Sequence, residues 1–371
     1  MKFDVGIESI QAEVKDTILV ISSSERLRVL SSAVLNGGLI EADGIINVQV
    51  PEGSGEDKND LHWNAEEFLK TQVERLHLPS GKVVGLMTAA KMKNVATATR
   101  KRGKTTISLF VTAGTTVAVT AGEPAASKNP LKPGTINIIL LVDGNMTDGC
   151  MIEAHKTITE AKTVALRELD LRSQFSGDLA TGTLTDTVAV GCTKKGELIS
   201  FAGTFTLIGE LIGQCVRECV KTAISQQEGF VASRPLSERL TERGIQIEKL
   251  TSLFSETLPV ESAKRQQLKT EVEQTLADKK IAGLVLASLR FDDDLRKGLI
   301  PEHAENTVGQ DVFEEIVSTA IRIYLSDNCI SDVECLRLMT NEKSLGPMTG
   351  CVLNAILKNA YSKIDQPKQP L

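Results

Sequence analysis

Short apolar runs separated by turn residues dominate residues 1–225. They are rich in β-branched side chains and are bounded by Gly, Pro or Asn, a pattern typical of β-strands. The clearest runs span 17–21, 45–50, 82–86, 105–111 and 136–142. Residues 52–60 contain no side chain that could be buried, and they predict a loop.

Three segments of this first part have a helical period instead. Residues 64–75, 151–171 and 207–224 combine good helix formers with apolar positions on one stripe. Strands and helices mixed without strict alternation predict an α+β N-terminal domain, with a mainly antiparallel sheet packed by helices.

The composition changes at 226–235, and the segments that follow have a helical period. Residues 262–279 and 312–325 each place their apolar side chains on one face. The pattern therefore predicts two domains, 1–228 and 236–364, of which the second is all-α. The length agrees, because 371 residues exceed what one ordinary core holds.

Composition and charge narrow the function classes. Hydrophobic residues at 41% and charged residues at 24% are typical of globular domains. Aromatic residues make up only 4% and the formal net charge is −6, which disfavours a nucleic-acid partner. A neutral or cationic small molecule fits this balance better.

Cysteine usage and the termini indicate the compartment. The seven cysteines are scattered and odd in number, unlike a secreted disulfide framework. The first residues do not resemble a signal peptide, and no apolar run is long enough to cross a membrane. We therefore expect a cytoplasmic, soluble protein that does not contact a membrane.

A series of short segments carries the most specific pattern. Most combine glycine with Thr, Asp, Glu or Lys, and they span 30–39, 85–90, 111–114, 134–138, 159–162, 180–186 and 201–204. In this order they resemble the adenosylcobinamide amidohydrolase family over residues 10–225. One departure is that the family tends to carry an asparagine shortly after Gly114, where this chain has Thr115 and Thr116.

The resemblance implies cleavage of the amide that joins the aminopropanol arm to the corrin ring of adenosylcobinamide. The products would be adenosylcobyric acid and 1-amino-2-propanol, and no cofactor is required. Hydrolysis of any amide needs an activated water or nucleophile, an acid for the leaving amine, and donors aimed at the developing oxyanion.

The motifs contain side chains for each of these roles. Glu160 and Asp186 are the candidate base and acid, and Lys162 and Thr183 complete the candidate catalytic set. Hydroxyls, an amide and glycine backbones would bind the substrate or its oxyanion, at Ser32, Gly37, Gly38, Thr88, Gly114, Asn137, Thr181 and Gly182.

Simpler interpretations stay open for these residues. Gly37, Gly38 and Gly134 are also typical turn glycines, and Glu160 and Lys162 are also typical of solvated helix charges. The hydroxyls of residues 181–183 could simply cap a turn. The four histidines lack metal-ligand spacing, so no metal site is predicted in the first domain. Cys215 and Cys219 are interpreted as buried packing on an apolar helix.

The second domain resembles the helical phosphatidylglycerophosphatase A-like fold, which in some corrinoid enzymes removes phosphate from α-ribazole 5′-phosphate. Its candidate Mg²⁺ ligands are Asp292, Asp294, Glu314 and Glu315. The expected Asp pair after Gly346 and Pro347 is missing, which favours a degenerate relative. Residues 292–294 would then be a helix-start or solvated acidic cluster.

Three hypotheses follow for the whole chain. The first is an amidohydrolase of corrinoid salvage, acting on adenosylcobinamide. The second adds an active phosphatase in the second domain, and the third is a corrinoid-binding carrier or sensor without catalysis. A homo-oligomer stays open, because sheet edges could pair between copies.

Overall fold

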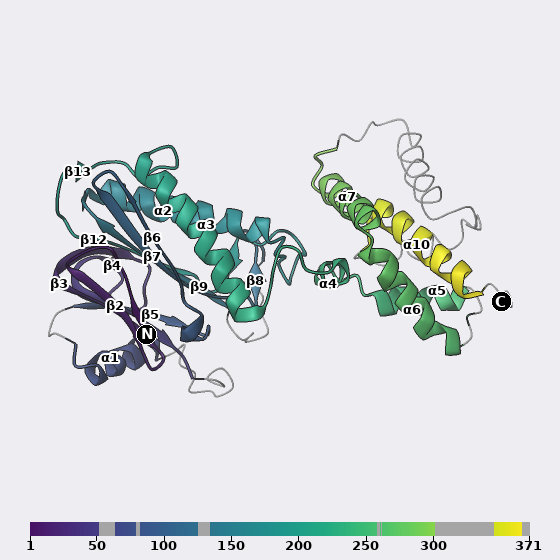
Figure 1. Ribbon diagram of the computed structural model, residues 1–371, viewed down its shortest axis with the longest axis horizontal. Helices are drawn as coiled ribbons and strands as arrows, with labels where there is room; N and C mark the ends of the chain where they lie inside the picture. Colours follow the sequence, from purple (N-terminus) through teal and green to yellow (C-terminus); the bar gives the residue numbers. More distant parts are fainter. Residues whose placement is uncertain are drawn as a thin grey trace. The chain divides into compact units, whose positions relative to one another are not determined.

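The computed structural model describes residues 1–51, 64–78, 82–124, 134–257, 260, 262–300 and 345–365. The chain forms two compact units, 1–232 and 233–371 (Figure 1). Each unit has its own hydrophobic core. Whether the units are independent domains with the predicted boundaries stays a prediction.

The first unit contains the strands and three of the long helices. In chain order its elements are β1 (Lys2–Phe3), β2 (Ile10–Lys15), β3 (Ile18–Ser31), β4 (Gly38–Gln49), α1 (Ala65–Arg75), β5 (Val83–Thr88), η1 (Met92–Asn94), β6 (Ala96–Arg102), β7 (Thr105–Gly114), β8 (Ala118–Val119), β9 (Thr135–Asp143), β10 (Asn145–Met146), α2 (Asp148–Glu168), β11 (Gly182–Thr183), β12 (Thr187–Cys192), β13 (Leu198–Ile199) and α3 (Leu207–Glu228).

One large sheet curls on itself. It runs β1-β2-β3-β12-β9-β7-β6, while β4 pairs with the other edge of β3 and β5 pairs with β4. Among the described strands of this sheet, the pairs β9–β12 and β4–β5 are parallel and the rest are antiparallel. A register shift between Ser22 and Leu27 bends β3, and β5 comes to lie against β9 and β7. The predicted mainly antiparallel sheet is therefore confirmed.

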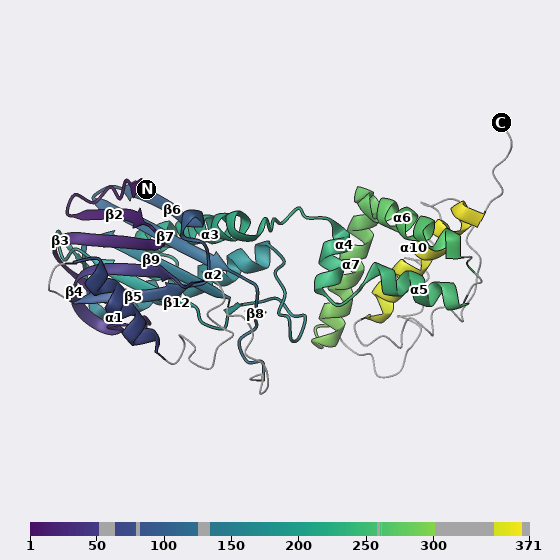
Figure 2. The ribbon, with the colours of Figure 1, turned by 90° about the horizontal axis from the view of Figure 1, so that it is seen from below.

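Alternation of side chains gives the curled sheet an inner and an outer face. Ile45, Leu86, Phe110 and Ile139 meet on the inner face, where they form one core. The neighbouring positions on β7, β9 and β12 point the other way and pack against α2 and α3. Figure 2 shows these two helices along one side of the strands and α1 near β4 and β5.

Local sequence explains where the two covering helices begin. The Thr147 hydroxyl accepts from the Cys150 backbone N–H at 3.1 Å and caps α2. Thr206 caps α3 in the same way, through the Gly209 N–H at 3.0 Å. Helix α3 ends at Gly229, whose left-handed φ of 69° is typical of a glycine C-cap. The three predicted helices of this unit are confirmed.

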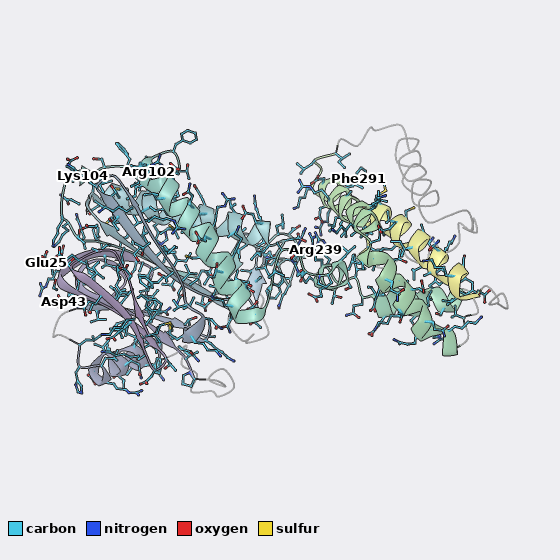
Figure 3. All side chains as sticks on the ribbon, in the orientation of Figure 1. Glu25, Asp43, Arg102, Lys104, Arg239 and Phe291 are labelled. Carbon is cyan, nitrogen blue, oxygen red and sulfur yellow. The ribbon has the colours of Figure 1, made fainter. Side chains whose placement is uncertain are left out.

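The basic run 100–104 spans the end of β6 and the turn into β7. Gly103 takes a φ of +61° there, and the flanking cations pair with glutamates of other elements. Arg102 lies 2.8 Å from Glu210 of α3, and Lys104 lies 3.0 Å from Glu197. Figure 3 shows where Arg102 and Lys104 lie. These exposed pairs indicate a solvated turn.

The second unit is helical in its described part. It contains α4 (Leu236–Glu242), α5 (Ile247–Thr257), α6 (Ser262–Ala277), α7 (Lys279–Arg296) and α10 (Pro347–Asp365). Leu268, Val272 and Leu276 of α6 contribute to its core, as the helical period predicts. The predicted helix at 312–325 lies outside the described residues, as does the predicted loop at 52–60. No described helix is long and apolar enough to cross a membrane.

Candidate functional site

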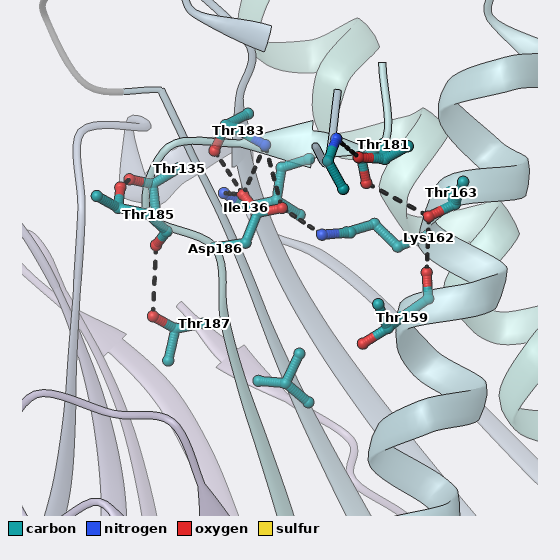
Figure 4. A network of polar contacts seen from close by, with 12 residues as sticks. Thr135, Ile136, Thr159, Lys162, Thr163, Thr181, Thr183, Thr185, Asp186 and Thr187 are labelled. Atoms are coloured by element: carbon teal, nitrogen blue, oxygen red, sulfur yellow. Dashed lines mark hydrogen bonds and ion pairs between the residues drawn. The ribbon is translucent and has the colours of Figure 1, made fainter. Parts of the chain in front are cut away.

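The carboxylate of Asp186 is the centre of a polar cluster between α2 and the loop that enters β12. Lys162, from the buried side of α2, forms an ion pair with Asp186 Oδ2 (Figure 4). The two side chains are only 9% and 13% exposed. A pair so shielded from solvent interacts more strongly than one on the surface.

Backbone and hydroxyl donors fix the other carboxylate oxygen. Asp186 Oδ1 accepts from the Ile136 N–H at 3.0 Å and the Thr183 N–H at 3.2 Å. The Thr183 hydroxyl donates to the same oxygen, and it lies 2.8 Å from the Gly134 carbonyl. The single hydroxyl proton of Thr183 cannot serve both acceptors at once. If this proton passes to Asp186, Thr183 Oγ1 keeps the Gly134 carbonyl oxygen as its neighbour.

Gly182 makes this close approach possible. A Cβ added there would lie 2.5 Å from Asp186 Oδ2 and 2.9 Å from Lys162 Nζ. Any larger residue would therefore displace the ion pair. The candidates Asp186, Lys162, Thr183 and Gly182 are thus brought together in one place.

Threonine hydroxyls secure the loop on both sides of the ion pair. Thr135 and Thr185 share a hydrogen bond of 2.6 Å. The Thr181 hydroxyl accepts from the Ala121 N–H at 2.9 Å, and Thr163 of α2 donates to the Thr181 carbonyl. The predicted binding residue Thr181 therefore has a structural contact, and its substrate contact stays a prediction.

Glu160 does not join this cluster. It is exposed, and residues two apart on a helix point about 200° apart, so it faces away from Lys162. The Glu160 side chain forms no hydrogen bond or ion pair with the described part of the chain. The structure therefore does not bring Glu160 and Asp186 together, because helix phase separates them.

His155 was missed by sequence reasoning, since it has no partner at ligand spacing in the chain. It lies two helical turns before Lys162 on one stripe of α2, with Thr159 between them. Burial lowers the pKa of His155, and the positive charge of Lys162 lowers it further. The imidazole of His155 is therefore neutral near pH 7, two helical turns from Lys162.

Asn137 follows Ile136 in β9, so its side chain points to the inner face of the sheet, away from Asp186. There its amide nitrogen donates to Asn47 Oδ1 at 2.9 Å and to the Met87 carbonyl at 2.6 Å. Both amide protons are engaged, so the predicted role of Asn137 as an oxyanion donor does not fit. The asparagine in the apolar run at 45–50 was the overlooked signal for this second cluster.

The remaining predicted binding residues have defined structural roles. Thr88 accepts from the Ala90 N–H at 3.1 Å, and Ser32 accepts from the Val188 N–H at 3.2 Å, two residues from Asp186. A Cβ at Gly37 would overlap the Ala33 carbonyl, and Gly38 has a φ of +90°. These two glycines are required by the turn between β3 and β4, and a substrate contact stays a prediction for them.

The segment after Gly114 shows what replaces the family's asparagine. The Thr115 hydroxyl and N–H both donate to the carboxylate of Glu228, at the end of α3. Gly134 approaches this segment closely, since a Cβ there would lie 2.8 Å from the Gly114 carbonyl. The Glu228 carboxylate of α3 therefore fixes the segment after Gly114, through its hydrogen bonds with Thr115.

A separate cavity of about 520 Å³ lies along the N-terminal strands β1 and β2, lined by residues 2–8 and 10–13. It contains none of the candidate residues.

The sequence of the first unit decides the family. Residues 3–232 match the adenosylcobinamide amidohydrolase family. The chain belongs to this family. Membership supports an amidohydrolase and, more broadly, a hydrolase of corrinoid salvage.

Individual proteins match a similar share of this chain. An uncharacterized protein of Methanocaldococcus jannaschii is 30% identical over 225 residues, which cover 56% of this chain and 84% of that protein. An adenosylcobinamide amidohydrolase of Methanosarcina mazei is 28% identical over 209 residues, covering 54% and 90%. The solved structure of the PH0078 protein of Pyrococcus horikoshii OT3 matches with 13% identity over 57% of this chain and 78% of its own. The TM-score of 0.29 is too low to indicate a shared fold.

The second unit does not bring its predicted metal ligands together in the described residues. Asp292 accepts from the Met348 and Thr349 N–H groups at the start of α10, and Asp294 pairs with Arg290 at 2.8 Å. The described residues contain no cluster of metal-ligating side chains. Glu314 and Glu315 lie outside those residues, so a Mg²⁺ site there stays a prediction. Residues 292–294 lie at the end of α7, which corrects the helix-start interpretation for their own helix.

Proposed function

We propose that the first unit hydrolyses the aminopropanol amide of adenosylcobinamide, giving adenosylcobyric acid and 1-amino-2-propanol. The observation that supports this proposal is the convergence of Asp186, Lys162 and Thr183 within a family motif. A carboxylate, an ammonium and a hydroxyl in contact supply the base, the acid and the nucleophile that amide hydrolysis needs.

The proposed reaction begins at Thr183. As its Oγ1 forms a bond to the amide carbon, its proton passes to Asp186 Oδ1 and the carbonyl oxygen becomes negative. Collapse of this intermediate breaks the C–N bond, and a proton from Lys162 neutralises the leaving amine. The proton on Asp186 then passes to Lys162, which restores the ion pair. Water attacks the Thr183 ester, Asp186 takes a proton from that water, and it returns the proton to Thr183 Oγ1 as the ester bond breaks. The net change is amide plus water to acid plus amine, and no cofactor takes part.

The test is incubation of purified protein with adenosylcobinamide, followed by mass analysis for adenosylcobyric acid and free 1-amino-2-propanol. Thr183→Val keeps the shape of the side chain and removes the nucleophile, so turnover should fall by about 100-fold or more. Glu160→Gln is the matched control, because Glu160 faces away from the pair, and turnover should stay near wild type.

Three outcomes would redirect the proposal. Tight binding of adenosylcobinamide without product would indicate a carrier or sensor. Wild-type turnover in Thr183→Val would leave activated water as the nucleophile and remove Thr183 from the mechanism. Loss of turnover in Glu160→Gln would restore the exposed carboxylate to the catalytic set.

A further inference from the structure

The inner face of the curled sheet changes from apolar to polar toward one end. Ile45, Phe110 and Ile139 lie in the apolar part. Two residues along the same strands, on the same face, are Asn47, Thr112 and Asn137, which are at most 1% exposed. We call these three residues the inner polar cluster. A buried polar cluster at the end of an otherwise apolar face needs a full account of its hydrogen bonds.

The hydrogen bonds within the inner polar cluster leave one acceptor and one donor without a partner among the described residues. Asn47 Nδ2 donates to Thr112 Oγ1 at 2.9 Å, and Asn137 Nδ2 donates to Asn47 Oδ1. Asn137 Oδ1 is buried and has no hydrogen-bond partner within the described part of the chain. Thr112 Oγ1 accepts a hydrogen bond from Asn47, but no described residue accepts a hydrogen bond from the Thr112 hydroxyl.

These two groups come from residues that pair directly across β7 and β9. One is an acceptor and the other is a donor, about one strand spacing apart. A primary carboxamide presents the complementary pair, since its N–H donates and its C=O accepts. An ionised carboxylate does not match, because it has no proton to give to Asn137 Oδ1.

The adjoining inner-face position on β7 is Gly114, two residues beyond Thr112. A Cβ there would meet only the Ala90 Cβ, at 4.0 Å, so the position has room for at least a methyl group. Its φ is not in the left-handed region, so the backbone does not require glycine. The space beside the inner polar cluster is therefore not explained by packing or by backbone conformation.

We propose that Asn137 Oδ1 and the Thr112 hydroxyl bind a primary carboxamide on the periphery of the corrinoid, one that is not cleaved. This inference rests on the proposed function. Asn137 directly follows Ile136, whose N–H binds Asp186, so the two sites lie on opposite faces of the same strand end. Both groups are buried, so a ligand arm reaches them only when this strand end opens, and the bound arm then selects amide over acid.

The experiment measures binding of adenosylcobinamide, and of derivatives in which one peripheral carboxamide has been hydrolysed to the acid. For wild type, one derivative should bind about tenfold more weakly, the effect of one lost hydrogen bond. Thr112→Val should bind adenosylcobinamide about tenfold more weakly and should discriminate less against that derivative. Gly114→Ala and Gly114→Val should weaken binding in that order by filling the adjoining space.

The control is Thr106→Val, the same change on the same face of β7, at a buried residue outside the inner polar cluster. It should leave binding of every ligand unchanged. Thermal unfolding of each variant checks that the fold is intact.

If Thr112→Val weakens the binding of adenosylcobinamide and of every derivative by the same factor, the inference is wrong. A bound water would then be the partner of Asn137 Oδ1. If wild type hydrolyses adenosylcobinamide and these variants keep its KM, the inference alone fails. If wild type binds adenosylcobinamide through the inner polar cluster without hydrolysing it, the proposed function alone fails.

Discussion

Two aspartates, one in each unit, have nearly the same surroundings. Asp186 and Asp292 each accept hydrogen bonds from two backbone N–H groups, of which at least one belongs to a segment far away in the chain. Each also lies against a glycine, Gly182 or Gly346, where a Cβ would overlap the carboxylate. Both residues therefore fasten one segment of chain to another.

The difference between them is what else the carboxylate contacts. Asp186 also binds an ammonium and a hydroxyl, from Lys162 and Thr183. Asp292 binds the first turn of α10, where Pro347 begins the helix, and its role is that of an N-terminal cap. Asp292, which contacts backbone donors, has a structural role. Asp186 also contacts Lys162 and Thr183, so its carboxylate can take part in proton transfer.

The largest expected difference is in turnover. Asp186→Asn keeps the shape of the side chain and removes the base, so kcat for release of 1-amino-2-propanol should fall about 100- to 10,000-fold. Asp292→Asn should leave kcat within about twofold, because that carboxylate takes no part in proton transfer. Equal losses in the two variants would show that both act through stability alone.

The ion pair of Asp186 should also separate stability from catalysis. Lys162→Met leaves Asp186 buried without its counter-charge, and the free energy of unfolding should fall by roughly 3 kcal/mol. Adding Asp186→Asn removes the unpaired charge and should restore much of that stability. Turnover should remain lost in the double variant. Urea unfolding and product release measure the two effects, and a double variant no more stable than Lys162→Met would contradict the buried-charge argument.

Sequence periodicity could predict the elements because they depend on local pattern. The runs at 45–50 and 136–142 became β4 and β9, and residues 64–75 became α1 with Leu69 fully buried. The curl of the sheet could not be read, since it depends on the bend of β3 and on a contact between β5 and β9. Such contacts join residues far apart in the chain.

The candidate site was predicted only in part, for a similar reason. Motif position brought Asp186, Lys162 and Thr183 into the candidate set, and they do meet. Glu160 was included with them although helix phase places it on the other side of α2. Asn47 was left out because a lone asparagine in an apolar strand shows no partner until the sheet curls.

A smaller effect should be seen at the structural aspartate. Asp292→Ala removes the acceptor for two N–H groups of α10, so the second unit should lose about 1 kcal/mol of stability. Asp294→Ala is the matched control. The Asp294 side chain pairs with Arg290 one helical turn away, and its loss should cost at most about 0.5 kcal/mol. Hydrogen exchange at Met348 and Thr349 measures the local opening. Equal exchange in both variants would remove the capping role.

The smallest effect tests whether the charge of Lys162 is felt beyond Asp186. Burial, and then Lys162, lower the pKa of His155, so the unfolded chain takes up a proton first as the pH falls. The contribution of His155 to stability is therefore present above about pH 6.5 and is lost as the pH falls toward its lower folded pKa. In Lys162→Met the pKa of His155 should rise, yet remain below about 6.5 because burial is the larger cause. Titration of the His155 ring by NMR measures this, with Lys156→Met as the control at an exposed lysine one residue away. An unchanged His155 pKa in Lys162→Met would mean that Asp186 neutralises the lysine completely, and that the cluster presents no net positive charge to a substrate.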